Sequence, residues 1–580
     1  MRVADVLAEG LACAGVRHAF GIPGGEVLTL IDALERAGIR MVTARHETAA
    51  GLMAEGAWHG NDAPGLLVVT VGPGVSNAVN AVANAALDRV PLIVISGAID
   101  PELRAAYTHQ VFDQAALLRP VVKGTFVAGA DNARVIIAQA LALAVQHPRG
   151  PVHIELPVAH ADAHLVEPPG VAAHDVPGAS SATPHAAAEL ARIAGALTRA
   201  RRPLLLVGLE AADARTTSAL RALLDARAMP VLTTYKAKGV LDERDPHCIG
   251  AVALSPKADA CVRPLLDSAD VVCLVGYDPV EMRASYVRPF GSKTLVLELA
   301  AAPRSHGMHT AHTTLVGDIA EHLMGLREQL CRSRQADAWS RDTLPQRTRA
   351  ALRAAFACHA RARVSSAPAT TQGRAVFAAT SGADTACVPV SAQSGGDASG
   401  LSPLAAAQVL ASVLTPDVRV TVDTGAHRII LSQVLQASAA RQVLQSNGLC
   451  TMGYALPCAI GLSLCSGRRV VAAMGDGGFE MVMGELATLR DLDLPVTLLV
   501  FDDSSLALID VKQQSRGLAR HAVWLGTTDH VGIARSLGGR GVRVHDGAGL
   551  RAALTDALSR PRGFTVIACA IERGAYAELL

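Results

Sequence analysis

Short aliphatic and β-branched runs alternate with Ala- and Leu-rich helical stretches along almost the whole chain. This alternation is typical of parallel sheets whose strands are joined by helices covering both faces. It is interrupted where Pro, Ala, Gly, Ser and Thr dominate. We therefore expect an α/β protein with three doubly wound parallel-sheet domains at 1–165, 186–335 and 402–580. A linker at 166–185 and a longer, partly disordered linker at 336–401 would join them.

The composition excludes several classes of partner. The 53 basic and 52 acidic residues give a formal net charge of +1, so nothing favours a nucleic acid or an anionic membrane. No apolar run reaches the roughly 18 residues that a membrane-spanning helix needs, and the first residues predict a helix rather than a signal peptide. The 11 cysteines include no Cys-x-x-Cys pair, which argues against a zinc site. We expect a cytoplasmic protein that acts on small molecules and associates with copies of itself.

Two acidic turns in the last predicted domain indicate a site for a metal-bound diphosphate. One buried run ends at Gly475-Asp476-Gly477-Gly478, whose glycines let backbone N–H groups approach an anion. The next run ends at Asp502-Asp503-Ser504-Ser505. Asp476, Asp503 and the Ser505 carbonyl can supply hard oxygen ligands to Mg²⁺, which takes its other ligands from phosphates and water. The first motif alone fits an ordinary strand-to-helix turn equally well, but the second turn at this spacing favours the metal site.

This pattern resembles the diphosphate half of the thiamin diphosphate enzymes, whose cofactor also needs a carboxylate. His46-Glu47 precedes a stretch of strong helix formers that follows a short apolar strand. The stretch is similar to the family segment that carries the activating glutamate. The resemblance implies that Glu47 is catalytic and hydrogen-bonds N1′ of the aminopyrimidine. A solvated helix glutamate is the alternative.

Three more N-terminal segments resemble family loops near the pyrimidine and the reacting carbon. They are Phe20–Gly25, Gly72–Asn77 and Tyr107–Gln114. The resemblance implies four cofactor-binding residues, Ile22, Pro23, Pro73 and Asn77. It also implies that His109 and Gln110 are catalytic and hydrogen-bond a developing alkoxide. Structural turns and helix-capping surface residues are the alternative interpretation.

Two C-terminal segments resemble the parts of the family that hold the two ends of the cofactor. Ser446–Pro457 is similar to the segment that grips the aminopyrimidine, which implies backbone contacts at Cys450 and Met452, with Met452 between the two rings. Asp423–His427 resembles the loop whose glycine and histidine approach the diphosphate. The implied cofactor-binding residues at this end are Gly425, His427, Gly475, Gly477 and Gly478.

The resemblance covers nearly the whole chain outside the longer linker and points to the acetolactate synthase branch. It implies decarboxylation of a 2-oxo acid, with pyruvate as the expected donor, to a C2-carbanion or enamine that is ligated to a carbonyl acceptor. Thiamin diphosphate and Mg²⁺ are the implied cofactors. FAD is not expected, because Gly276–Glu281 is similar to the flavin-free catabolic enzymes. In this family the pyrimidine-binding domain of one subunit faces the diphosphate-binding domain of another, which implies a homodimer or homotetramer.

Two departures from the family pattern keep alternatives open. Asp502-Asp503 stands where many relatives have Asn-Asn, and the added negative charge should weaken cofactor affinity. The segment Leu506–Gln513 does not match the usual sequence, so the acceptor is not settled. A non-carboligating 2-oxo acid decarboxylase or C–C lyase is one alternative. A non-catalytic assembly subunit is the other.

Overall fold

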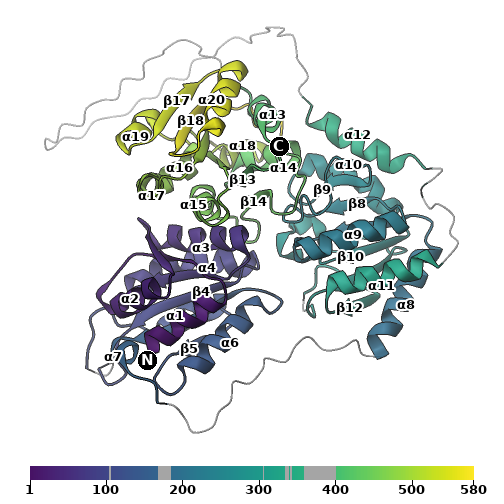
Figure 1. The fold of residues 1–580 in the computed structure, drawn as a ribbon. Coiled ribbons are helices and arrows are strands. Elements are labelled where there is room, and N and C mark those ends of the chain that lie inside the picture. The colour runs from purple at the N-terminus through teal and green to yellow at the C-terminus, as the bar shows by residue number, and fades with distance from the viewer. Residues whose placement is uncertain (104–105, 167–183, 305, 333–338, 340–341, 358–399) are drawn as a thin grey trace.

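Three parallel sheets of six strands each form the framework of the protein (Figure 1). The computed structural model describes residues 1–580 except 104–105, 167–183, 305, 333–338, 340–341 and 358–399. The expected fold class, three α/β domains in chain order, is confirmed. The two predicted linkers lie in large part outside the described residues.

The N-terminal sheet has the strand order β2-β1-β3-β4-β6-β5. Its strands are β1 (His18–Gly21), β2 (Arg40–Thr43), β3 (Gly65–Val69), β4 (Leu92–Ala98), β5 (Thr125–Val127) and β6 (Pro151–Pro157). Its helices are α1 (Val3–Cys13), α2 (Leu28–Arg36), α3 (Glu47–Asn61), α4 (Pro73–Leu87), α5 (Gln114–Leu118), α6 (Ala133–Val145) and α7 (Val158–Asp162). Every residue of β3, β4 and β6 is buried, as expected for strands covered on both faces.

The central sheet has the strand order β12-β11-β10-β7-β8-β9. Its strands are β7 (Pro203–Val207), β8 (Val231–Thr233), β9 (Cys248–Ala251), β10 (Val271–Val275), β11 (Leu295–Ala300) and β12 (Thr313–Val316). Its helices are α8 (Pro184–Arg199), α9 (Ala214–Ala226), α10 (Pro256–Ser268) and α11 (Ile319–Cys331). A further helix, α12 (Leu344–Ala355), lies within the segment predicted as a linker and packs against α10 and β9.

The C-terminal sheet has the strand order β14-β13-β15-β16-β18-β17. Its strands are β13 (Arg419–Val422), β14 (Val443–Gln445), β15 (Val470–Gly475), β16 (Val496–Asp502), β17 (Arg540–Val544) and β18 (Thr565–Ala570). Its helices are α13 (Pro403–Val413), α14 (Ala426–Val434), α15 (Ala455–Ser466), α16 (Asp476–Val482), α17 (Leu486–Leu492), α18 (Ala507–Ser515), α19 (His530–Ser536) and α20 (Gly547–Ser559).

In each sheet there is a point at which strands begin to be added on the other side of the first strand. These switch points lie between β1 and β3, between β7 and β10, and between β13 and β15. In open parallel sheets, ligands bind in the crevice outside the carboxyl ends of the strands at this point. The topology therefore provides one candidate crevice in each domain.

The N-terminal and C-terminal domains pack tightly along α3 and α15 (Figure 1). Two glycines allow the close approach. A Cβ atom on Gly56 would lie 2.1 Å from the Cys458 carbonyl oxygen, and one on Gly461 would lie 1.9 Å from the Met53 carbonyl oxygen. The two helix backbones could not approach so closely with any larger residue at these positions.

A buried ion pair links all three domains. Lys236 of the central domain lies 2.7 Å from Asp88 of the N-terminal domain. The other oxygen of Asp88 accepts hydrogen bonds from the backbone N–H groups of Asn447 and Gly448, at 3.2 and 2.8 Å, in the C-terminal domain. Because a buried charge is costly unless it is paired and hydrogen-bonded, this junction favours one relative placement of the domains.

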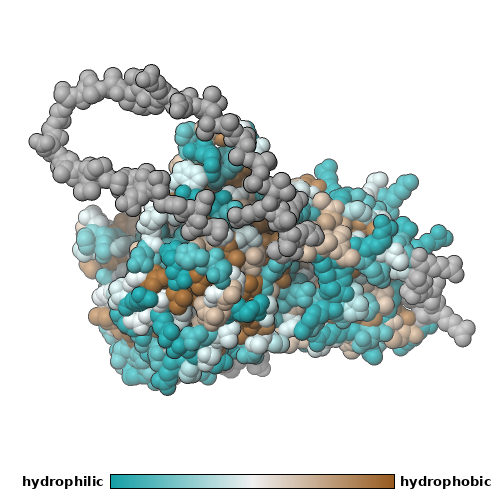
Figure 2. All heavy atoms as spheres, turned by 90° about the horizontal axis from the view of Figure 1, so that it is seen from above, coloured by the Kyte–Doolittle hydropathy of each residue, from teal (hydrophilic) through white to brown (hydrophobic). Residues whose placement is uncertain are grey.

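The outer surface mixes polar and apolar residues. Figure 2 shows hydrophilic and hydrophobic side chains interspersed on one face of the molecule. Among the described residues, none of the helices combines the length and the hydropathy that crossing a bilayer requires.

Replacing Gly461 with Ala should destabilise the protein, because the new methyl group would overlap the Met53 carbonyl oxygen. We expect a loss of about 1–3 kcal/mol, the usual cost of overpacking, seen as a lower midpoint of thermal unfolding at fixed protein concentration. Gly195→Ala is the matched control in a helix, since its nearest neighbour is the flexible Arg199 side chain at 3.3 Å. An unchanged midpoint for Gly461→Ala would contradict the tight packing.

Candidate active site

A cavity of about 120 Å³ lies at the switch point of the C-terminal sheet. Its walls come from the loops that follow β13, β15 and β16, and from the start of α14 and α18. Nine of the residues predicted to bind the cofactor or the metal line it: Gly425, His427, Met452, Gly475, Asp476, Gly477, Gly478, Asp503 and Ser505. The structure thus brings the two acidic turns and the glycine loops together.

Two facing acids dominate the electrostatics of this cavity. Asp476 Oδ1 accepts from the Gly477 N–H at 2.7 Å, and Asp503 Oδ1 accepts from the Ser505 N–H at 3.1 Å. The Oδ2 atoms of both acids are buried without a hydrogen-bond partner. Burial raises the pKa of Asp476 to about 6. Burial, together with the negative charge of Asp476, raises the pKa of Asp503 to about 7.

These orphaned oxygens fit the requirements of a hard divalent cation. A cation between them would satisfy both carboxylates and remove the electrostatic cost of ionising them together. Among the described residues, no three His, Cys, Asp or Glu side chains cluster as a complete metal site. That fits Mg²⁺, which takes few ligands from the protein and keeps others from phosphate and water.

The glycines and His427 form the remaining wall. A Cβ atom on Gly478 would lie 2.5 Å from Asp423 Oδ2, and one on Gly477 would point toward Leu506 at 3.0 Å. The ring of His427 stacks on Phe501, with centroids 5.5 Å apart, and its Nε2 is buried without a partner. Burial lowers the pKa of His427 to about 3, so the ring is neutral at pH 7. A neutral imidazole has one N–H group, so Nε2 can donate to a phosphate oxygen in the tautomer that places the ring hydrogen on Nε2.

Asp423 fixes the segment that carries Met452, and the sequence analysis did not assign it a role. It is fully buried, and its carboxylate accepts from the backbone N–H groups of Gly453 at 3.0 Å and Tyr454 at 3.2 Å. Burial raises the pKa of Asp423 to about 7. The sequence did carry a signal for such a role: Asp423, like Asp476, lies at the end of a run of residues predicted as a buried strand.

Asp502 does not face the cavity, although it was grouped with Asp503 as the second acidic turn. It is the last residue of β16, and its carboxylate lies 3.0 Å from Arg543 and 3.4 Å from His530. Since side chains alternate along a strand, Asp502 and Asp503 point in different directions. The negative charge of Asp502 is therefore balanced by basic neighbours outside the cavity, whereas the Asp503 carboxyl group lines the cavity.

The predicted pyrimidine-side residues of the N-terminal domain gather at the carboxyl edge of its sheet. Glu47 is the first residue of α3 and is buried, and its Oε2 accepts from Asn77 Nδ2 at 3.0 Å. Thr48 Oγ1 donates to the Asn77 carbonyl at 2.6 Å. Pro73 begins α4, and Ile22 and Pro23 directly follow β1. Sequence positions far apart thus meet at one switch point.

His109 and Gln110 lie on an exposed loop beside the turn before α4. A Cβ atom on Gly72 would lie 3.0 Å from the Gln110 Cβ, and the Gly72 N–H donates to Gln114 Oε1 at 2.9 Å. Gln114 also donates to the Gly97 carbonyl at 3.1 Å, which anchors the loop. The His-Gln pair therefore stands next to the Pro73 turn.

Among the described residues, the N-terminal group does not line the diphosphate-side cavity of its own chain. Every residue that lines the diphosphate-side cavity lies between 424 and 576. Cys450 does not line it; this residue has a left-handed backbone with φ 56° and is exposed. Tyr576 lines it from near the C-terminal end, and no local pattern could have indicated this because its position depends on the tertiary fold.

The fold and the site define an α/β protein that can hold a diphosphate-bearing, metal-assisted ligand at a sheet switch point. Comparison with known families agrees. Residues 1–117 match the thiamine pyrophosphate enzyme N-terminal TPP binding domain, 190–326 match the central domain of these enzymes, and 423–569 match their C-terminal TPP binding domain. The chain belongs to the thiamine pyrophosphate (thiamin diphosphate) enzyme family and is an enzyme that depends on this cofactor.

Curated relatives of the chain are acetolactate synthases. The acetolactate synthase of Bacillus subtilis (strain 168) is 28% identical over 94% of this chain and 88% of its own length. The catabolic acetolactate synthase of Raoultella terrigena is 27% identical over 96% of this chain and 92% of its own. The acetolactate synthase isozyme 3 large subunit of Escherichia coli (strain K12) is 26% identical over the same shares. The sequence is therefore acetolactate synthase-like over most of its length.

The facing acids predict a pH-dependent effect of Mg²⁺. An acid with a raised pKa in the folded state binds protons more tightly when folded, so stability falls as the pH rises from about 4 through the folded pKa values. With EDTA present, we expect the melting temperature of the wild type to fall, relative to that of Asp503→Asn, as the pH rises from about 4. The fall should continue until the pH has passed the pKa values of the two acids in the folded protein, about 6 for Asp476 and about 7 for Asp503. The rise in melting temperature caused by Mg²⁺ should grow over the same interval. Calorimetry over a pH series measures both, and a Mg²⁺ effect independent of pH would contradict the assignment.

Proposed function

We propose that this enzyme uses thiamin diphosphate and Mg²⁺ to decarboxylate a 2-oxo acid, with pyruvate as the expected donor, and to ligate the product to a carbonyl acceptor. One observation carries the proposal. Two buried carboxylates with orphaned oxygens face a glycine-lined cavity at the switch point of a domain that matches the family's TPP binding domain.

At the diphosphate end, the chain's own residues would hold a metal ion and an anion. Asp476, Asp503 and the Ser505 carbonyl are suited to bind Mg²⁺, because their oxygens surround one side of the cavity. Gly475, Gly477 and Gly478 stand at the start of α16, where backbone N–H groups attract phosphate oxygens. In the tautomer that places the ring hydrogen on Nε2, His427 can donate a hydrogen bond to the same anion.

At the pyrimidine end, Glu47 is the proposed acid and base. Thiamin diphosphate, when bound, supplies an electron sink for cleaving the bond next to a carbonyl group. The Asn77 amide holds one oxygen of Glu47 at 3.0 Å, leaving the carboxyl group oriented to exchange a proton with a ring nitrogen. Met452 and the backbone at Cys450 would position the ring, as would Ile22, Pro23 and Pro73.

His109 and Gln110 are the proposed donors to the substrate oxygen. Both are exposed on the loop beside the Pro73 turn, so a substrate can reach them. A neutral or charged imidazole and an amide can each donate a hydrogen bond to an oxygen that gains negative charge during the reaction.

We infer that the site is completed by a second copy of the chain. The diphosphate-side cavity is lined from the C-terminal domain alone, whereas Glu47 lies at the carboxyl edge of the N-terminal sheet. A two-fold arrangement would place the Glu47 of one subunit opposite the cavity of its partner, in a homodimer or in a homotetramer made from two such dimers.

We expect the central domain to bind no FAD. Dinucleotides bind at the switch point of such sheets, with the diphosphate at a helix N-terminus. At the switch point of the central sheet, where β7 and β10 lie side by side, Arg304 donates to Glu210 at 2.9 and 2.6 Å and to the Tyr277 carbonyl at 3.2 Å. The N-terminus of α9 is already capped by Asp213, which accepts from the Thr216 N–H at 2.9 Å. The acidic cap and the ion pair both oppose a diphosphate there.

Incubation of the purified protein with thiamin diphosphate, Mg²⁺ and pyruvate tests the reaction. We expect CO₂ and a ligated product such as acetolactate by mass spectrometry. Acetaldehyde without ligation would indicate a plain decarboxylase, and no turnover with any 2-oxo acid would indicate an assembly subunit.

Glu47→Gln should keep the fold but slow deuterium exchange at C2 of the bound cofactor by about 100- to 10,000-fold, because the proton acceptor is lost. Glu9→Gln, an exposed change on α1, is the control.

Co-expression of two inactive variants tests the shared site. Glu47→Gln and Asp476→Ala chains should each be inactive alone. In a mixed dimer, one site would combine the intact Glu47 of one chain with the intact Asp476 of the other. Random pairing should therefore restore roughly a quarter of the wild-type activity. Recovery of no activity from a co-purified mixed dimer would show that each site lies within one chain.

A further inference from the structure

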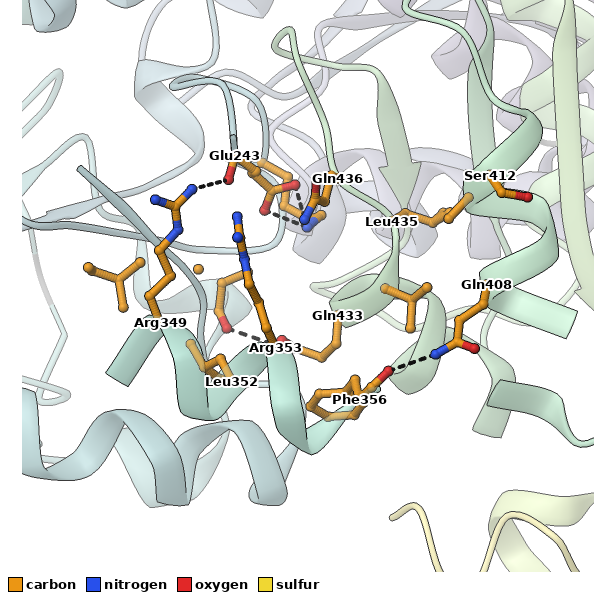
Figure 3. Close-up of a pocket in the computed structure, with 16 residues that line it drawn as sticks. Glu243, Arg349, Leu352, Arg353, Phe356, Gln408, Ser412, Gln433, Leu435 and Gln436 are labelled. Atoms are coloured by element: carbon orange, nitrogen blue, oxygen red, sulfur yellow. Dashed lines mark hydrogen bonds and ion pairs between the residues drawn. The ribbon is translucent and has the colours of Figure 1, made fainter. Parts of the chain in front are cut away.

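A second and larger cavity, of about 420 Å³, lies between the central and C-terminal domains (Figure 3). Its walls come from the loop after β8, from β9 and α12, and from α13, α14 and the residues that follow α14. It shares no residue with the diphosphate-side cavity, and it does not touch the β7/β10 switch point. Pockets of this size at domain boundaries are common sites for small ligands.

The charge in this cavity is unbalanced. Three basic side chains and one acidic side chain line it: Lys238, Arg349, Arg353 and Glu243. Lys238 lies 2.6 and 2.9 Å from the two oxygens of Glu243, and the Ala437 N–H donates to one of them at 2.6 Å. Glu243 is therefore already neutralised and hydrogen-bonded, which leaves the two arginines in excess.

Neither arginine has a carboxylate partner among the described residues. Arg349 donates to the backbone carbonyls of Glu243 and Arg244, at 3.1 and 2.8 Å, and its Nε is buried without a partner. Arg353 is exposed, one turn along α12. Figure 3 shows both side chains extending from α12 toward Glu243. Burial, and next the charge of Arg353, lowers the pKa of Arg349, so an anion between the two would relieve their repulsion.

The other walls suit an organic molecule rather than a bare ion. Leu352 and Phe356 from the α12 region and Leu435 from the segment after α14 supply apolar surface, and they are buried. Gln408 and Gln436 add amide groups to the wall; Gln408 donates to the Phe356 carbonyl at 3.0 Å and keeps its own carbonyl oxygen available. Apolar surface combined with convergent polar groups is typical of small-molecule sites.

We propose that this cavity binds a small organic anion, a carboxylate or a phosphate ester, whose charged group lies between Arg349 and Arg353 and whose body packs against Leu352 and Phe356. Guanidinium groups match both oxyanions through paired N–H donors. The site is independent of the proposed reaction, since its residues belong to none of the catalytic or cofactor-binding positions.

Calorimetric titration of the protein, with thiamin diphosphate and Mg²⁺ present throughout, tests the proposal. The probes are phenyl phosphate and phthalate, which carry a phosphate and two carboxylates on an aromatic ring, and phenol, which is uncharged. We expect at least one anion to bind with micromolar to millimolar affinity, more tightly than phenol, and more weakly as the salt concentration rises. The tighter of the two anions identifies which oxyanion the site prefers.

Arg353→Gln is the decisive variant, because this side chain makes no hydrogen bond within the described structure and its loss should not disturb folding. We expect the bound anion to be held about tenfold or more weakly. Arg347→Gln, two residues before Arg349 on the same helix but not in the cavity wall, should bind as the wild type does. The proposal fails if neither anion binds in the millimolar range, if phenol binds equally well, or if Arg353→Gln leaves the affinity unchanged.

Discussion

The close packing of α3 against α15 is the constraint on which the rest of the structure depends. It exists because Gly56 and Gly461 let two backbones meet at distances that exclude any side chain. The helix that begins at Glu47 is thereby held against the helix that follows the Met452 segment. Glu55, buried in the same interface, accepts from Tyr454 at 3.0 Å and so ties the two elements together. Displacement of either helix would therefore move Glu47 relative to the Met452 segment.

Two cavities among the described residues each hold a pair of like charges. Asp476 faces Asp503 with oxygens that have no partner, and Arg349 lies near Arg353 without a described carboxylate. Lys236 and Lys238, by contrast, are paired with acids at 2.7 and 2.6 Å. Since like charges without a compensating partner repel each other and destabilise a fold, their presence at a cavity favours a ligand of opposite sign. The same reasoning that favours a cation at the first position favours an anion at the second.

Sequence alone predicted the features that depend on local pattern. The strand and helix alternation gave the three parallel sheets, and the two acidic turns predicted a cavity that the structure contains. It missed two features: Tyr576 reaches the cavity from near the chain's end through the tertiary fold, and α12 is an amphipathic helix that packs on a sheet edge within the segment predicted as a linker. Asp502 was grouped with Asp503 because a strand end could not be placed to within one residue. The roles of individual residues follow from resemblance and are not settled by geometry.

Helix α14 contributes to both cavities. Ala426 and His427 at its beginning line the diphosphate side, and Gln433 and Val434 at its end line the cavity between domains. Nine residues of α-helix span only about 13 Å, and a short packed helix moves as one rigid body. Any occupant that shifts α14 from one end must alter the free energy of binding at the other, and thermodynamics requires the influence to be equal in both directions. A single element of secondary structure thus connects the two cavities physically.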